Sequence, residues 1–297
     1  MGTDGRGGEE EGSAAQRVRL AGEKETLLIT LYAKALDSRS SHPILGDRKA
    51  DEMVRSIDYD FERLRGFGNV MVARARQLDE WVRKFLASSS DAVVLNLGCG
   101  LDTRISRIDP PAGVAWFDVD YPDVIEVRRR FFSDREGYRM LGSSVTDRGW
   151  LEVVPRGRPT MAVAEGLLEY LTQEDVRGLL NGLTERFDRG QVAFDVMSSF
   201  AVASGRSRLK ERTGAEHRWA VDDVRIVDGL DRGLRRISNL AVVRSRYLPT
   251  GYRVAFGAFS AIPRFRDTMR LLRYEISPRD GKGGRGRVEG GAGAGDP

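Results

Sequence analysis

The sequence predicts an α/β fold in which a doubly wound, mostly parallel sheet follows a helical N-terminal extension. Three observations predict it. Strand-like and helix-like runs alternate from about residue 91 onward. The first strand-like run, residues 92–97, is almost unbroken in its apolar character, which is typical of a parallel strand buried on both faces. It ends in Gly98-Cys99-Gly100, where the two glycines let the backbone turn sharply.

The 297 residues are long enough for one large domain. Residues 1–20 are rich in Gly and Glu and residues 278–297 are rich in Gly, so we expect both to be disordered tails. Residues 21–277 contain no repeat and no long Pro/Gly linker. We therefore expect a single domain with a helical preface over 21–90 and an α/β core over 91–277.

Three helices are predicted in the preface. Residues 26–36 and 47–57 have helical character and are separated by a His-Pro break. In the third, over residues 67–86, apolar side chains recur three or four positions apart and form one stripe. Arg74 lies at the edge of this stripe, so its stem follows the buried face and its guanidinium needs an anion or a route to water.

The predicted core elements follow in order along the chain. Further strands are expected at residues 113–120, 139–142, 160–164, 191–197, 236–243 and 271–276. A helix follows the second strand through Phe132, and the capping-box pattern at Thr172–Asp175 begins a helix that runs to Phe187. Between residues 198 and 230 the alternation weakens, and we expect a helical insertion there.

Composition excludes several classes of protein. The 48 Lys+Arg and 44 Asp+Glu leave a net charge of +4, and the two signs alternate, so nucleic acid is not indicated as a partner. No run approaches the length of a membrane span, and the first residues lack the basic and apolar regions of a secretion signal. We therefore expect a cytoplasmic protein that neither spans nor binds a membrane.

The cysteine and histidine content excludes further kinds of site. Cys99 is the only cysteine, so no internal disulfide is possible, and its place in the glycine turn argues against a catalytic thiolate. His42 and His217 are far apart and have no clustered carboxylates near them in the sequence, so we expect no metal site.

Two further features favour a nucleoside-containing cofactor at the carboxyl ends of the central strands. The glycine turn permits close approach of a cofactor, but the dinucleotide fingerprint needs another glycine where this chain has Thr103, so a cofactor without a pyrophosphate is favoured. Asp118 and Asp120 end the second strand roughly twenty residues later, where a carboxylate can bind ribose hydroxyls in NAD or S-adenosylmethionine alike. Both point to one face, so spacing leaves the choice open. A solvated acidic strand end is the alternative for either.

Three core segments together resemble the leucine carboxyl methyltransferase family: VVLNLGCGLDTR at 93–104, FDVDYP at 117–122 and AEGLLEYL at 164–171. Segments of the preface resemble its bacterial, tetracenomycin-like branch of polyketide O-methyltransferases, namely residues 25–28, 31–35, 43–47 and 57–61. The resemblance covers about residues 25–275. It implies a class I, Rossmann-like methyltransferase fold with seven strands, and O-methylation with S-adenosylmethionine as cofactor.

The resemblance also implies residues that hold the cofactor. The family's arginine falls on Arg74, where it would pair with the carboxylate of the cofactor, although an internal Asp or Glu is the alternative partner. Its motif glycine falls on Gly98, in the same turn as Gly100, and its ribose-binding acid falls on Asp120 rather than Asp118.

The remaining implied cofactor residues either depart from the family's pattern or have an alternative interpretation. The pair beside the adenine falls on Ser144 and Val145, but protein-methylating members have Asp in place of Ser144, which weakens that contact. The glutamate after the fourth strand falls on Glu165, for which a helix-start carboxylate is the alternative interpretation. The basic residue near the N-terminus falls on Lys34, with Arg39 as a competitor.

The methyl acceptor is predicted from the chemistry of the transfer. A carboxylate is already ionised at neutral pH and needs no base, whereas a phenol with a pKa of about 10 needs one, for which His217 is the first candidate. Tyr170, and His217 with Trp219, are candidates for the acceptor pocket, with packing or surface exposure as the alternative. Because no triad or paired acids are seen, we favour carboxyl methylation of a small aromatic or polyketide-like acid.

Other functions remain as alternatives. The glycine turn and Asp120 alone would allow an NAD-dependent oxidoreductase, and a protein that binds the cofactor without turnover is also conceivable. A protein C-terminal carboxyl methyltransferase would share the chemistry but needs an open cleft. The insertion at 198–230 is long enough to cover a small-molecule pocket, which favours a small acceptor.

Overall fold

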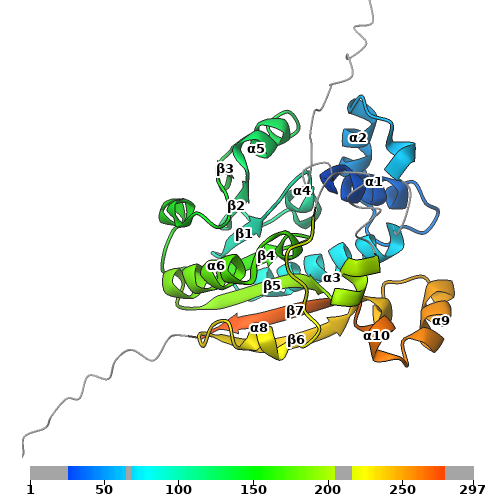
Figure 1. Cartoon of the computed structure of the whole chain (residues 1–297). Coiled ribbons are helices and arrows are strands. Elements are labelled where there is room, and N and C mark those ends of the chain that lie inside the picture. Colours follow the sequence, from blue (N-terminus) through cyan, green and yellow to red (C-terminus); the bar gives the residue numbers. More distant parts are fainter. Residues whose placement is uncertain (1–25, 65–67, 205–215, 278–297) are drawn as a thin grey trace, which may run out of the picture.

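The computed structural model describes residues 26–64, 68–204 and 216–277. They form a seven-stranded sheet with the order β3-β2-β1-β4-β5-β7-β6 (Figure 1). Its strands are β1 (Val93–Leu97), β2 (Ala115–Asp120), β3 (Tyr138–Gly142), β4 (Thr160–Ala164), β5 (Gly190–Met197), β6 (Leu234–Ala241) and β7 (Met269–Ile276). Strands β1 to β5 pair in parallel, and β7 runs antiparallel between β5 and β6. The predicted doubly wound, mostly parallel sheet is confirmed.

The helices of the preface and the core lie largely where the sequence predicts them. The α-helices with printed bounds in the described residues are α1 (Thr26–Ser38), α2 (Arg48–Ser56), α3 (Gly68–Ala87), α4 (Arg104–Ile108), α5 (Pro122–Arg128), α6 (Gln173–Arg186), α8 (Arg225–Asp228), α9 (Thr250–Phe259) and α10 (Pro263–Arg266). Short 3-10 helices are η2 (Phe61–Leu64), η3 (Arg148–Val153), η4 (Leu168–Tyr170) and η5 (Val242–Arg244). The predicted capping box of α6 is present, because Thr172 and Asp175 each bind the other's backbone N–H.

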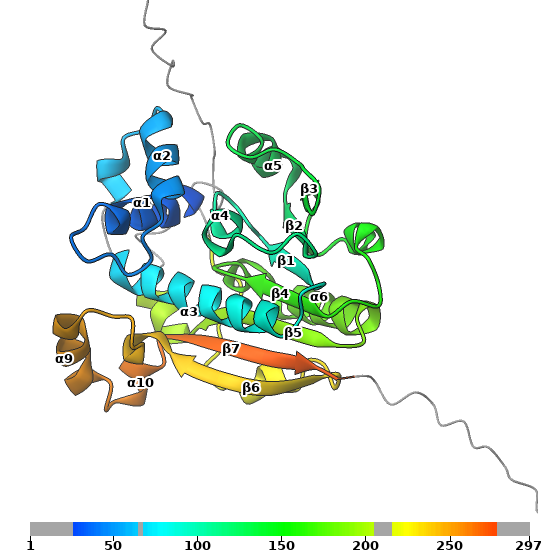
Figure 2. The ribbon, with the colours of Figure 1, turned by 180° about the vertical axis from the view of Figure 1, so that it is seen from behind.

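Two hydrophobic cores lie on opposite faces of the sheet. Along β1, Val94 belongs to one core while Val93 and Leu95 belong to the other, as the two-residue period of a strand requires. The first core is covered by the preface helices and α3, and the second by α6 and α8. Figures 1 and 2 show α6 and α3 on the two opposite faces. The strand order reverses between β1 and β4, where open α/β sheets bind ligands.

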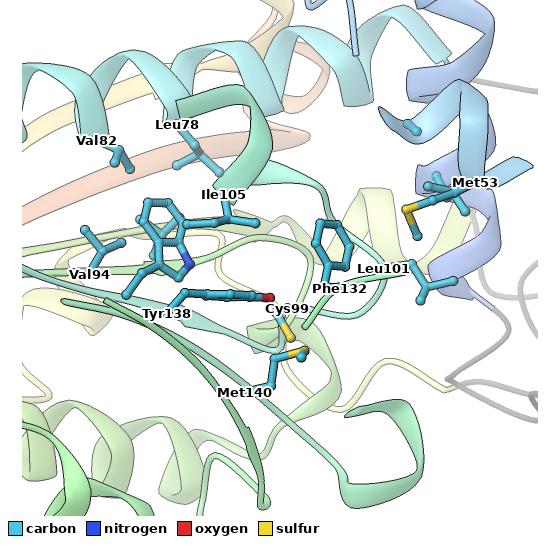
Figure 3. Close-up of a cluster of buried hydrophobic side chains, with 14 of the residues drawn as sticks. Met53, Leu78, Val82, Val94, Cys99, Leu101, Ile105, Phe132, Tyr138 and Met140 are labelled. Atoms are coloured by element: carbon cyan, nitrogen blue, oxygen red, sulfur yellow. The ribbon is translucent and has the colours of Figure 1, made fainter. Parts of the chain in front are cut away.

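Cys99 belongs to the first core. Figure 3 shows it among other buried side chains, near Met140 and Tyr138. Burial raises the pKa of the Cys99 thiol well above its usual range, so this side chain packs as a small apolar group.

Some element boundaries differ from the prediction. Helix α5 ends at Arg128 rather than at Phe132, because the chain continues in tight turns that bury Phe132 in the first core. Strand β6 begins at Leu234, ahead of the expected residue 236. These ends depend on tertiary packing, which a local pattern does not contain.

Part of the predicted organisation falls outside the described residues, including both tails and residues 205–215. Within the predicted insertion at 198–230, residues 199–204 are helical and α8 follows an irregular segment that starts at residue 216. The insertion and the division into preface and core therefore stay predictions. Across the described ranges, no helix is long and apolar enough to cross a membrane.

Candidate active site

The glycine turn lies at the carboxyl end of β1. Gly98 and Gly100 have φ angles of +59° and +48°, which L side chains rarely adopt. A Cβ on Gly98 would lie 2.7 Å from Leu167 Cδ1, and one on Gly100 would lie 2.5 Å from Leu27 Cδ2. Two neighbours thus pack directly on the turn: the first turn of α1 and the segment after β4. The positive φ angles and these two neighbours require glycine at both positions, whereas the expected approach of a cofactor to the turn stays a prediction.

The two acidic residues of β2 have different environments. Asp118 is fully buried, and its carboxylate accepts hydrogen bonds from the guanidinium of Arg128 at 2.9 Å and the hydroxyl of Tyr138 at 2.6 Å. Asp120 reaches the glycine turn, where its Oδ2 accepts a hydrogen bond from Gly100 N at 2.7 Å. Asp118 therefore stabilises the core, and Asp120 is the acid that lies at the turn. Burial raises the pKa of Asp120 to about 6.

Beside the turn, charged side chains form a buried cluster. Ion pairs join four cations and five carboxylates, each with a side chain at most 11% exposed: Lys34, Arg74, Arg104, Arg107, Asp47, Asp79, Asp102, Glu165 and Asp195. We call these nine residues the buried charge cluster. It contains one more carboxylate than cations, and its members come from α1, α3, α4, β5 and the connecting loops.

Glu165 lies at the centre of the buried charge cluster. It forms ion pairs with Lys34 Nζ at 3.5 Å, with Arg74 Nη2 at 3.2 Å and with Arg104. Burial would raise the pKa of Glu165, but the three cations lower it to about 2. The carboxyl group is therefore ionised at any physiological pH.

The guanidinium of Arg74 is hydrogen-bonded to two acidic members of the buried charge cluster. Its Nη1 donates to Asp195 Oδ2 at 2.8 Å and its Nη2 to Glu165 Oε1 at 3.2 Å, so the internal acidic partners that the sequence left open are present. Its Nε is buried and makes no hydrogen bond to any described residue. This N–H can donate a hydrogen bond to a further anionic partner.

Of the two basic residues considered near the N-terminus, Lys34 belongs to the cluster. Its Nζ donates to Asp102 Oδ1 at 2.7 Å, and the side chain is 2% exposed. Arg39 lies at the surface and pairs with Asp51 on α2 at 2.6 Å. The structure thus brings Lys34, and not Arg39, to the predicted site.

The predicted adenine-side pair follows β3. Ser143 N donates to Asp120 O at 2.8 Å, which places this loop beside the end of β2. Ser144 Oγ is 2.8 Å from Thr146 Oγ1, and Val145 packs in the second core. The structure therefore brings this segment next to Asp120, as the prediction requires.

The candidates for the acceptor pocket gather around η4. The rings of Tyr170 and His217 are 5.2 Å apart and tilted by 51°. Trp219 is buried in the second core, in agreement with the packing alternative. His42 lies elsewhere, on a cavity of about 340 Å³ between α1 and α9. No group of three or more metal-ligating side chains occurs among the described residues.

The chain is similar in sequence to one protein family and to several known proteins. The family model described as leucine carboxyl methyltransferase matches residues 11–140. The tetracenomycin polyketide synthesis O-methyltransferase TcmP of Streptomyces glaucescens is 44% identical over 267 residues, which cover 87% of this chain and 98% of that protein. The S-adenosyl-L-methionine-dependent methyltransferase dpfgK of Gibberella zeae is 32% identical, over 74% of this chain and 82% of its own.

The chain belongs to the leucine carboxyl methyltransferase family.

It is an S-adenosylmethionine-dependent O-methyltransferase, and the oxidoreductase and non-catalytic alternatives fall away. Solved structures agree on the fold. A DUF574 family protein from Streptomyces avermitilis matches with a TM-score of 0.58 at 13% identity, covering 85% of this chain and 97% of its own. A putative methyltransferase from Thermobifida fusca matches with a TM-score of 0.54 at 16% identity, covering 82% of this chain and 94% of its own.

Sequence reasoning missed several residues of this methyltransferase's site. Asp102 and Arg104 follow the glycine turn directly, and the sequence identifies them only as part of the motif at 93–104. Asp195 gave a usable signal, because a lone carboxylate inside a buried strand needs a partner. Glu169 on η4 gave none, since its neighbours in the sequence do not show that its side chain is 5% exposed.

Proposed function

We propose that this methyltransferase transfers a methyl group to a carboxylate oxygen of a small aromatic or polyketide-like acid. The observation that carries the proposal is the buried charge cluster beside the glycine turn. Its one excess carboxylate favours a cofactor that carries a sulfonium cation over one that carries an anionic pyrophosphate. The relative TcmP, named for O-methylation in polyketide synthesis, and the carboxyl chemistry in the family's name support the acceptor class.

The residues at the turn fit S-adenosylmethionine. Asp120 offers a carboxylate for the ribose hydroxyls, and the loop of Ser144 and Val145 adjoins it for the adenine. Arg74 offers its unpartnered Nε–H to the carboxylate of the cofactor, and Lys34 belongs to the same cluster. Glu165 supplies the negative charge for the amino group. Gly98 and Gly100 add no side chain of their own at the turn, where Leu167 and Leu27 already pack.

When bound, the cofactor supplies an activated methyl group on a sulfonium. The protein's part is to hold the acceptor oxygen in line with the departing sulfur, which alone can supply much of the acceleration. An ionised carboxylate needs no proton transfer, so the chemistry asks only for positioning and exclusion of water. Tyr170 and His217 offer a ring surface for an aromatic acceptor at the end of the site near η4.

Product analysis tests this function. Purified protein is incubated with S-adenosylmethionine and a panel of aromatic acids that also carry a phenol, and the products are treated with mild alkali. We expect methyl esters, which alkali cleaves back to the acid. A methyl ether from every acceptor would contradict the proposal. Methylation of a peptide's C-terminal carboxyl group, with no small acid accepted, would contradict the substrate class.

A further inference from the structure

We propose that Glu169 binds the methyl acceptor: its buried carboxyl group forms a hydrogen bond with the acceptor's carboxylate and so holds the reacting oxygen in place. The inference rests on the proposed function, because it assumes an acid as acceptor. It assigns a role to a residue that is not among the proposed cofactor residues.

Hydrogen bonds from distant parts of the chain hold Glu169 and its neighbour Tyr170 in place. Its carbonyl oxygen accepts hydrogen bonds from Arg218 N at 2.7 Å and from Trp219 N at 3.3 Å. The next residue, Tyr170, is hydrogen-bonded to Thr26 at the start of α1 and lies against the ring of His217. Glu169 is therefore held where η4 meets both the first turn of α1 and the segment after residue 215.

The side chain of Glu169 is buried but incompletely bonded. It is 5% exposed, and its Oε2 makes no hydrogen bond to any described residue. Because buried polar atoms in native proteins are nearly always bonded, this oxygen has a free position for a hydrogen-bond partner, and we assign that position to the acceptor. Arg74, the cation that acts on Glu169, already donates both Nη groups to Asp195 and Glu165.

The surroundings decide the protonation state of Glu169. The titratable and charged groups around it are Arg74 of α3, Asp195 of β5, Glu165 after β4, Tyr170 of η4, and His217 with Arg218 on the segment that packs on η4. Burial, together with Asp195, raises the pKa of Glu169 to about 8. At neutral pH the group is mostly a carboxylic acid and can donate a hydrogen bond.

A donor at this position suits an anionic acceptor. Asp195 and Glu165 lie near Glu169, and each is already paired with Arg74. A hydrogen bond donated by Glu169 would therefore give the acceptor carboxylate a favourable partner beside these two acidic side chains. During transfer the acceptor oxygen forms a bond to the methyl carbon, the carbon–sulfur bond breaks, and its electron pair stays on sulfur. The proton remains on Glu169, so no base is consumed.

Calorimetry with a simple aromatic acid tests the inference. The probe is 2-naphthoate, titrated into protein saturated with S-adenosylhomocysteine at pH 7 and pH 9, with 2-naphthamide as the uncharged control. We expect binding of 2-naphthoate to weaken about tenfold at pH 9, because Glu169 has then lost its proton. Binding of 2-naphthamide should change little. In Glu169→Gln, whose amide donates at both pH values, the loss at pH 9 should disappear.

Controls separate this inference from the proposed function. Glu174→Gln, an exposed glutamate on α6, should behave as the wild type. An unchanged pH dependence in Glu169→Gln would overturn the role of Glu169, and so would the absence of 2-naphthoate binding to the wild type at pH 7. If binding depends on Glu169 as expected but no methyl ester of any acid forms, the proposed function fails, and only the binding of a carboxylate by Glu169 stands.

Discussion

Asp120 illustrates how one carboxylate can serve a ligand at the expense of the fold. It is 7% exposed, and its bonds to Gly100 N and Tyr121 N do not offset the cost of burying its charge. Burial raises its pKa to about 6, so the folded protein above that pH holds an ionised group that the unfolded chain would hold more easily. We interpret this as the cost of keeping an acceptor ready for ribose hydroxyls.

Asp120→Asn should therefore stabilise the protein without cofactor. At pH 7.5 we expect the free energy of unfolding to rise by on the order of 1 kcal/mol, or about 2–4 °C in Tm. The advantage should shrink as pH falls from about 6 toward the usual carboxyl pKa, since the folded wild type then takes up its proton. Thermal melts at pH 7.5 and pH 5 measure this, and a less stable variant at pH 7.5 would refute the explanation.

At the scale of elements, α1 is docked onto the glycine turn. Leu27 packs against Gly100, Thr26 bonds Tyr170, and Lys34 reaches the buried charge cluster two turns later. One face of a single helix thus covers the site and carries one of its cations. Because these contacts join segments about 70 to 140 residues apart in the chain, a local hydrophobic pattern cannot reveal them.

Gly100→Ala measures this docking. We expect a loss of about 1–3 kcal/mol in excess of the loss in Gly157→Ala, because both positions have positive φ but only Gly100 meets a neighbour. Urea denaturation gives both values. Adding Leu27→Ala to Gly100→Ala should recover part of the excess by making room for the methyl group. Equal losses in the two glycine variants would show that Leu27 does not press on the turn.

At the scale of the whole molecule, periodicity and resemblance predict much of the fold. The unbroken run of β1 and the alternation after it give the parallel strands, and the Thr172 capping pattern gives the start of α6. For the site, the glycine turn could be located, and the family resemblance, though not the spacing, favoured Asp120 over Asp118. The bonds of Asp118 to Arg128 and Tyr138 add that Asp118 belongs to the core. A local pattern can show that a buried charge needs a partner, but not which distant residue supplies that partner.

The buried charge cluster could likewise be predicted only in part from the sequence. The stripe geometry of α3 predicts that Arg74 needs an anion, and the structure supplies Glu165 and Asp195 from beyond β4 and from β5. The order of the strands in the sheet determines which acidic side chains lie within reach of Arg74. We therefore propose that the buried charge cluster acts as one unit, spread over helices and strands, in holding the cofactor.

Calorimetric titration of S-adenosylhomocysteine into the wild type, Arg74→Ala and Asp120→Ala tests this account most directly. Each variant should bind more than tenfold more weakly, because a lost charged hydrogen bond costs on the order of 1.5 to 3 kcal/mol. Arg39→Ala, which removes an exposed ion pair outside the cluster, should bind as the wild type does. Unchanged affinity in both Arg74→Ala and Asp120→Ala would contradict the assignment of the site.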